Sequence, residues 1–230
     1  MKKSLKTLLL FFAAMAAASC ATLGRATKES AGPSGPIDHE TQYRVACHEA
    51  GHTVVAAILR PKYPLMAIVV RTELVDGSPF GTTNHANVNR LETVRDILEE
   101  AAEDLAGREA EVALLGEPTN GGTSDLIHAN RLFRSMCTTS GLCGSLLVEE
   151  TPSAASNKKI ARCLDLARAR ARVLVKENSG TIRDLAGLIM SMPEIDKKRM
   201  LETERLRTFL KDHVLVTEAA AGHPPKGTCP

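Results

Sequence analysis

The sequence has no tryptophan and few other aromatic residues, with five phenylalanines and two tyrosines among 230 residues. A hydrophobic core must therefore be built from leucine, isoleucine, valine, alanine and methionine. A large net charge is also missing, because 29 basic residues are balanced by 27 acidic ones. This balance gives no electrostatic reason to expect a nucleic-acid partner, and we predict none. The length fits one domain of ordinary size with tails.

A phosphate-binding loop of the form G-x-x-x-x-G-K-[ST] is absent from the sequence as well. Many ATPases hold the phosphates of their nucleotide with this loop, so we expect no ATP as a partner of these residues. One basic cluster, made of Arg168, Arg170 and Arg172, has the composition of a nucleic-acid-binding surface. We interpret it as a solvated helix face.

Residues 1–20 have the composition of an export signal. Lysines near the start precede an uninterrupted apolar run from Leu8 to Ala18, which is short for a bilayer span. The segment ends in Ala17-Ala18-Ser19-Cys20. This ending resembles a bacterial lipobox, except that alanine stands at position 17 where leucine is usual. We predict a lipoprotein signal peptide with the lipid on Cys20. Cleavage without lipidation is the first alternative, and an uncleaved membrane anchor is the second.

Residues 21–37 are small and polar and contain two Gly and two Pro between positions 32 and 36. This composition predicts a flexible tether. We expect a folded domain over 38–213 and a disordered tail over 214–230, where glycine and proline are again frequent. A tether behind a lipidated Cys20 predicts a protein of the bacterial cell envelope, anchored to the membrane and facing the periplasm or the exterior.

The sequence His48-Glu49-Ala50-Gly51-His52 is an H-E-x-x-H motif. On a helix, two histidines four residues apart lie on the same face, so both imidazoles can point at one Zn²⁺. Glu49 can then hold the water that becomes the nucleophile. Gly51 inside a helix costs roughly 1 kcal/mol relative to alanine, which suggests that another backbone packs closely there.

The surrounding pattern predicts a mainly α fold with a small β-hairpin or sheet beside the motif helix. Asp38 is suited to cap this helix, and Pro61 ends it. A buried strand is expected over 65–71, a turn at Asp76-Gly77 and a short returning strand over 80–84. This pair is either a plain hairpin or an edge at which a substrate chain pairs.

Helical patterns dominate the rest of the chain. Residues 88–115 form the longest, with an apolar stripe and acidic residues expected on the opposite face. Thr123 or Ser124 caps the next helix and places Asp125 in its first turn, on the same stripe as apolar residues. Two helices follow around residues 160–174 and 182–189, and we expect a last helix from Asp196 to about His213.

Two histidines do not complete a catalytic zinc site, which uses three protein ligands and leaves a position for water. The long metzincin motif would place another histidine six residues after His52, but Ile58 is there. A later acidic residue must therefore supply the third ligand. Asp125 faces inward, and the helix dipole favours the ionised form that a ligand needs.

Several segments resemble, in order, the peptidase domain of FtsH-type membrane proteases, which are AAA+ zinc metalloproteases. The zinc helix of that family resembles Val45–His52 followed by Val54-Val55-Ala56. Four further segments resemble parts of that family. Gly81-Thr82-Thr83 resembles its substrate-side strand, and Leu105–Glu111 resembles one of its helices. Gly122–Leu126 resembles the segment that carries its aspartate ligand, and Pro193–Asp196 resembles the start of its last helix. The resemblance covers roughly residues 43–213.

The resemblance implies that His48, His52 and Asp125 bind Zn²⁺ and that Glu49 is the general base. It implies hydrolysis of peptide bonds in a protein or peptide substrate, here without the ATPase. The alternative is a catalytically inactive lipoprotein that keeps the fold and binds a protein partner. The sequence leaves a homo-oligomer open.

The sequence contains six cysteines. Assigning Cys20 to lipid leaves five, so at least one is free or pairs between chains. An oxidising compartment favours disulfides, and Cys137 and Cys143 flank a turn at which a bridge can form. Cys47 adjoins a predicted ligand, but neighbouring helical residues point about a quarter-turn apart, so we do not count it as one.

Overall fold

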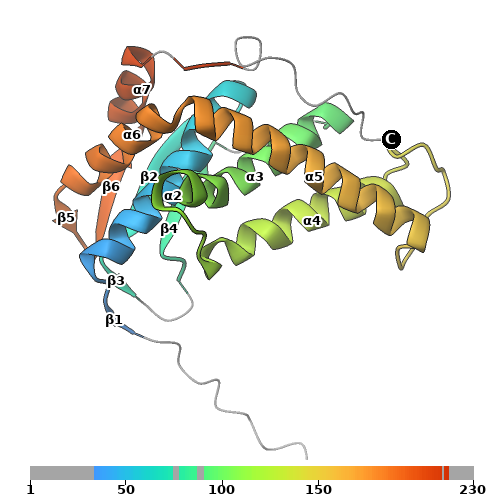
Figure 1. Ribbon diagram of the computed structural model, residues 1–230, viewed down its shortest axis with the longest axis horizontal. Coiled ribbons are helices and arrows are strands. Elements are labelled where there is room, and N and C mark those ends of the chain that lie inside the picture. Colours follow the sequence, from blue (N-terminus) through green and yellow to red (C-terminus); the bar gives the residue numbers. More distant parts are fainter. Residues whose placement is uncertain (1–33, 75–77, 87–90, 214, 218–230) are drawn as a thin grey trace, which may run out of the picture. The chain divides into compact units, whose positions relative to one another are not determined.

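The computed structural model describes residues 34–74, 78–86, 91–213 and 215–217. The predicted signal peptide with Cys20 and the predicted turn at Asp76-Gly77 lie outside these residues, as do most of the tether and the tail. The described helices are α2 (His39–Leu59), α3 (Val94–Leu115), the 3-10 turn η1 (Asn120–Gly122), α4 (Thr123–Thr138), α5 (Ala154–Glu177), α6 (Ser179–Ser191) and α7 (Thr203–Asp212). The prediction of a mainly α fold is confirmed (Figure 1).

The described strands form two antiparallel sheets. The larger has the order β4-β2-β6-β5, made of β4 (Gly81–His85), β2 (Leu65–Arg71), β6 (Lys198–Glu202) and β5 (Glu194–Ile195). The smaller pairs β1 (Gly35–Pro36) with β3 (Glu73–Leu74). The returning strand predicted over 80–84 is β4, shifted by one residue. Strand β4 lies at one end of this order, so among the described residues it is an edge strand.

Helix α2 occupies the centre of the fold and carries the H-E-x-x-H motif. Its N-terminus is capped by Asp38, whose Oδ1 accepts a hydrogen bond from Thr41 N at 2.9 Å, and it ends at Leu59, two residues before Pro61, as predicted. The helix packs against α3 and α6 and against strands β2 and β4. All residues of α2 from Ala46 to Ala56 are buried, so the motif lies inside the protein.

The prediction that Asp196 begins the last helix is wrong. Asp196 and Lys197 both have positive φ, at 51° and 60°, and they form the turn between β5 and β6. This backbone suits a tight hairpin, because its twist matches that of the flanking strands. Strand β6 then pairs with β2 and buries Leu201, and α7 begins only at Thr203.

Helix α3 begins at Val94, later than the predicted 88. Thr93 and Asp96 form a capping box there, and Leu91, expected on the buried stripe, is 96% exposed. The prediction that the acidic residues of this helix face solvent is wrong for three of them, Glu103, Glu109 and Glu111, which are buried. The reason is that α3 packs against α2, α4 and α5, which leaves it little solvent-facing surface.

The interpretation of the arginine run on α5 as a solvated face holds for Arg168 and Arg172, which are exposed, and is wrong for Arg170, which is buried. Arg168 Nε and Arg172 Nε donate to the two carboxylate oxygens of Glu109 at 2.6 and 3.0 Å. Arg170 is 7% exposed and lies 3.5 Å from Glu99. The run therefore joins α5 to α3 by ion pairs, which is a structural role.

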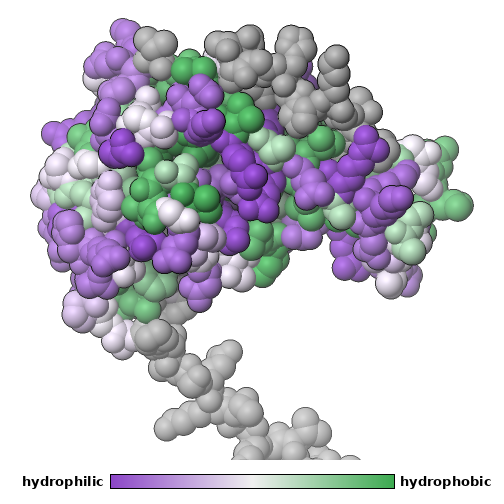
Figure 2. Space-filling view, in the orientation of Figure 1, coloured by the Kyte–Doolittle hydropathy of each residue, from purple (hydrophilic) through white to green (hydrophobic). Residues whose placement is uncertain are grey.

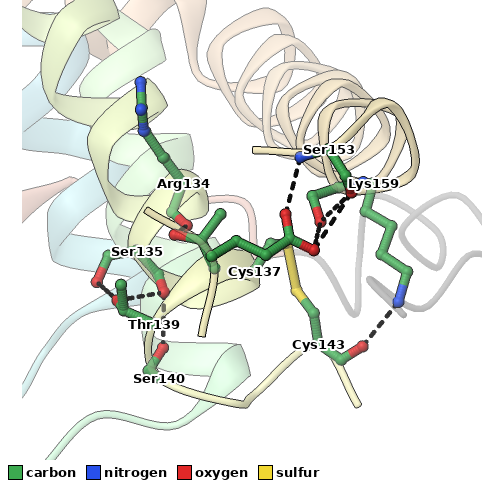
Figure 3. Close-up of a disulfide and its surroundings, with 11 residues drawn as sticks. Arg134, Ser135, Cys137, Thr139, Ser140, Cys143, Ser153 and Lys159 are labelled. Carbon is green, nitrogen blue, oxygen red and sulfur yellow. Dashed lines mark hydrogen bonds between the residues drawn. A yellow bond between two sulfur atoms is a disulfide. The ribbon is translucent and has the colours of Figure 1, made fainter. Parts of the chain in front are cut away.

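A disulfide joins Cys137, near the end of α4, to Cys143 in the following loop. Figure 3 shows that Lys159 of α5 reaches this loop, where its Nζ donates to the carbonyl oxygen of Cys143 at 2.8 Å. The same loop carries the exposed apolar residues Leu146, Leu147 and Val148. Figure 2 shows hydrophobic surface on the right of the view, where this loop lies. Cys47 is a buried free thiol.

Both ends of the described chain contact the domain. Ile37 N donates to the carbonyl oxygen of Thr72 at 2.8 Å, and the side chain of Asn178 makes two hydrogen bonds with the backbone of Val216. Parts of the predicted tether and tail thus belong to the folded unit. Within the described ranges, every helix is too short or too polar to cross a bilayer.

Candidate metal centre

Three side chains predicted as metal ligands meet between α2 and α4. His48 and His52 lie one helical turn apart on α2, and Asp125 is in the first turn of α4. Asp125 Oδ2 is 3.0 Å from His48 Nε2 and 3.5 Å from His52 Nε2. One ligand atom from each residue lies within 4.8 Å of the others, so a single metal ion can be held by all three.

Each histidine is oriented through its second ring nitrogen. His48 Nδ1 donates to Glu111 Oε1 at 2.6 Å, and His52 Nδ1 donates to the backbone oxygen of Glu103 at 2.7 Å. Both contacts come from α3. Hydrogen bonds of this kind fix the tautomer and the ring orientation of metal-binding histidines. They leave both Nε2 atoms facing Asp125.

Close packing of α3 against α2 requires glycine at two positions. A Cβ on Gly107 would lie 2.5 Å from His52 Nε2 and 2.6 Å from His48 Nε2. A Cβ on Gly51 would lie 2.8 Å from the backbone oxygen of Ala106, so the predicted close approach of another backbone at Gly51 is confirmed. Gly107 therefore leaves the space in which the two imidazoles lie.

Glu49 lies beside the three residues and is 6% exposed. Its Oε2 accepts a hydrogen bond from the Thr83 hydroxyl of β4 at 2.8 Å. Burial raises the pKa of the Glu49 carboxyl, while the neighbouring histidines and the Thr83 hydrogen bond act in the opposite direction. A bound dication would also favour the ionised form.

The charges of the three candidate ligands depend on one another. Burial alone would lower the pKa of His52, but the hydrogen bond to Asp125 and the negative charges nearby raise it to about 10. The pKa of His48 is raised in the same way by Asp125 and Glu111. The pKa of Asp125 falls below its usual range because both imidazoles donate to it, although burial acts against this. A metal ion must displace these shared protons in order to bind.

The donor set fits a zinc ion. Two imidazole nitrogens and one carboxylate oxygen are a ligand combination found in catalytic zinc sites, and three protein ligands leave a position for water. Cys47 does not belong to the group, because the described residues that can share one metal ion are the two histidines and Asp125.

Two further histidines lie near the centre, and both are engaged with carboxylates of α3. His85, at the end of β4, lies 2.6 Å from Glu103 Oε1, and Arg60 donates to the other oxygen of Glu103 at 2.8 Å. His128 Nδ1 lies 2.8 Å from Asp104 Oδ2. The Glu103 side chain thus links the end of β4 to the end of α2.

Sequence reasoning missed the roles of Glu111, Glu103, Gly107 and Thr83. The roles of Gly107 and Glu111 could have been predicted from the sequence. A glycine inside a helix indicates close packing, and an acidic residue four positions later lies on the same face. The backbone oxygen of Glu103 and the hydroxyl of Thr83 carry none, since their positions follow from how α3 and β4 pack on α2.

Comparison with known proteins agrees with this geometry. The model of peptidase family M41 matches residues 36–155, just over half of the chain, and includes all four residues of the centre. The chain belongs to peptidase family M41. The FtsH-type resemblance predicted from the sequence motifs is confirmed.

Curated relatives of this M41 chain include the ATP-dependent zinc metalloprotease FtsH 1 of Symbiobacterium thermophilum. The two are 28% identical over 187 residues, which cover 76% of this chain and 31% of the relative. The ATP-dependent zinc metalloprotease FtsH of Cupriavidus metallidurans is 26% identical over 211 residues, which cover 81% of this chain and 29% of the relative. The ATP-dependent zinc metalloprotease FtsH of Hahella chejuensis is 32% identical over 108 residues, which cover 46% of this chain and 17% of the relative. The M41 chain thus spans less than a third of the length of these relatives.

Proposed function

We propose that this chain is a zinc-dependent endopeptidase that hydrolyses peptide bonds of unfolded or loosely folded proteins. The observation that carries the proposal is the meeting of His48, His52 and Asp125 around one point, with Glu49 beside them. The M41 relatives, which are named zinc metalloproteases, support the same metal and the same reaction class.

His48, His52 and Asp125 would hold the metal, and the Glu111 carboxylate and the Glu103 carbonyl would keep the imidazoles aimed at it. Bound Zn²⁺ supplies Lewis acidity that lowers the pKa of water and polarises a scissile carbonyl. Glu49 accepts the proton of the nucleophilic water and transfers it to the leaving amine.

The substrate chain is proposed to pair with β4. This edge strand lies directly beside Glu49, because a Cβ on Gly81 would be 2.7 Å from Glu49 Oε1. An extended peptide can add to an exposed sheet edge through backbone hydrogen bonds. A peptide held there would present its backbone next to the general base.

We also propose an exported protein of the bacterial cell envelope, anchored to the membrane through lipid on Cys20. The support is the composition of residues 1–20 and the lipobox-like ending at Cys20. The disulfide between Cys137 and Cys143 is in keeping with an oxidising compartment. Mass spectrometry of protein from membranes of a bacterial host tests this, since lipidation adds a diacylglyceryl group to Cys20 and Cys20→Ala removes it.

The experiment that tests the enzymatic proposal compares wild type with Glu49→Gln on an unfolded casein-type substrate. Glutamine has the same shape but cannot accept the proton, so this variant is expected to retain zinc and fold and to lose cleavage. Glu40→Gln, an exposed change in the first turn of the same helix, is the matched control. Zinc-loaded wild type without cleavage would favour the alternative, a non-catalytic module that binds proteins.

A further inference from the structure

Two residues of β4 constrain the carboxylate of Glu49 from outside its own helix. Thr83 Oγ1 lies 2.8 Å from Glu49 Oε2. On the other side, a Cβ on Gly81 would lie 2.7 Å from Glu49 Oε1 and 2.9 Å from its Cγ. The strand therefore contacts both oxygens of the carboxylate, one through a hydrogen bond and one through close packing.

The Thr83 hydroxyl has one proton and three acceptors within reach, of which the Thr53 hydroxyl, at 3.4 Å, is the farthest. Besides the carboxylate, the backbone oxygen of Glu49 lies 3.1 Å from Thr83 Oγ1. That backbone oxygen already accepts a hydrogen bond from the Thr53 hydroxyl at 2.8 Å. The carboxylate is both the nearest and the strongest acceptor, since hydrogen bonds to a charged group are shorter and stronger than neutral ones. Thr83 therefore donates to Oε2.

We propose that Thr83 is a positioning residue for the general base. Its hydroxyl holds Oε2, which leaves Oε1 free to take the proton of the nucleophilic water, and Gly81 supplies the space that Oε1 occupies. This inference rests on the proposed peptidase function. Because β4 is also the strand proposed to receive the substrate, one element sets the position of both the peptide and the base.

A purely structural role for Thr83 makes different predictions. If the residue only joined β4 to α2, its loss would lower stability and weaken substrate binding, and it would affect KM as much as kcat. A positioning role lowers kcat and leaves KM nearly unchanged, because ground-state binding does not use the Glu49 carboxylate.

The experiment compares Thr83→Val, which keeps the shape and removes the hydroxyl, with Thr83→Ser, which keeps the hydroxyl. Thr208→Val, an exposed threonine on α7 whose hydroxyl donates only to the backbone of its own helix, is the control outside the site. Zinc content, thermal unfolding, and kcat and KM on unfolded casein are measured for each. We expect Thr83→Val to lower kcat by about tenfold to a hundredfold with full zinc, while Thr83→Ser and Thr208→Val stay close to wild type.

Equal losses in Thr83→Val and Thr83→Ser, or a change in KM alone, would overturn the proposal. Crystal structures of the metal-free variants give a second readout that does not depend on activity. In Thr83→Val the Glu49 carboxylate should leave its wild-type position, and in Thr83→Ser it should keep it. An unmoved carboxylate in Thr83→Val refutes the positioning role even if wild type cleaves nothing, which would refute the peptidase function separately.

Discussion

His48 Nδ1 lies 2.6 Å from Glu111 Oε1, and both side chains are almost fully buried. The second oxygen of this carboxylate accepts a hydrogen bond from Thr119 N at 2.6 Å. Glu111 therefore joins a candidate ligand to the segment just before α4, which carries Asp125. Glu111 thus holds the His48 imidazole directly and is also hydrogen-bonded to the backbone that leads into α4.

Replacing Glu111 by glutamine should weaken metal binding and preserve the fold. An amide has one acceptor oxygen, while His48 Nδ1 and Thr119 N both donate to Glu111. We expect zinc affinity to fall by about tenfold to a hundredfold. Competition with a zinc-binding dye measures this, with Glu117→Gln, an exposed change just after the same helix, as control. Equal affinities in the two variants would contradict the role.

Gly107→Ala should disrupt the metal centre itself. The added Cβ would lie 2.5 Å from His52 Nε2, and neither imidazole can move freely because each is held through Nδ1. We expect loss of zinc and destabilisation by about 1–3 kcal/mol, as for other overpacked cores. Zinc analysis and denaturant unfolding measure both effects.

Gly187→Ala is the control for this change. Gly187 also lies in a helix, α6, but a Cβ added to it would come within 4 Å of no described atom outside its own helix. The variant should be as stable as wild type or more stable by up to about 1 kcal/mol, because alanine favours helix more than glycine does. If Gly107→Ala behaved in the same way, the close packing of α3 on the histidines would be refuted.

The motif helix and the metal centre were the most predictable parts of the molecule. The i, i+4 spacing of His48 and His52, the cap at Asp38 and the stop at Pro61 are local features, so sequence alone gives them. Asp125 lies far along the chain, and its approach to the histidines required the apolar stripe of its helix together with the family resemblance.

Features set by long-range packing were not predictable. The acidic residues of α3 form a pattern that is typical of a solvent-facing helix surface. Glu103, Glu109 and Glu111 are nevertheless buried, because α2, α4 and α5 pack around α3. The hairpin turn at Asp196-Lys197 contains neither glycine nor asparagine, the usual signals for positive φ, so the segment resembles a helix start.

The pair of His128 and Asp104 should make stability depend on pH. Their hydrogen bond at 2.8 Å raises the pKa of His128 above its ordinary value of 6.5, although partial burial acts against it. Glu100, 3.8 Å away, also favours the charged imidazole, and Arg131 opposes it. The folded state thus binds this proton more tightly than the unfolded chain. The stabilisation is complete below about pH 6.5 and is lost as the pH rises through the raised pKa.

Denaturant unfolding of the metal-free protein at a series of pH values measures this effect. Metal is removed because zinc binding itself releases protons. The unfolding free energy of His128→Gln should fall less than that of wild type as the pH rises above about 6.5. Identical pH dependence in the two proteins would show that the pair does not contribute.

Cleavage should require a substrate that is already unfolded, and ATP should not affect it. An edge strand such as β4 accepts an extended chain, and a folded domain offers few extended segments with free backbone groups. Opening a typical domain costs about 5–15 kcal/mol. The FtsH relatives are named ATP-dependent, but the 230 residues of this chain contain no phosphate-binding loop. These residues therefore have no recognisable means of coupling nucleotide hydrolysis to unfolding.

The decisive substrate is one domain in two forms, a stable wild type and a destabilised variant with the same cleavable sequences. The destabilised form should be cleaved faster, roughly in proportion to its larger unfolded population, because the protease acts on the open state when opening and closing are fast. Addition of ATP should leave both rates unchanged. Equal cleavage of the two forms would mean that the centre accepts folded chains, and stimulation by ATP in the purified protein would reveal a nucleotide site that the sequence does not predict.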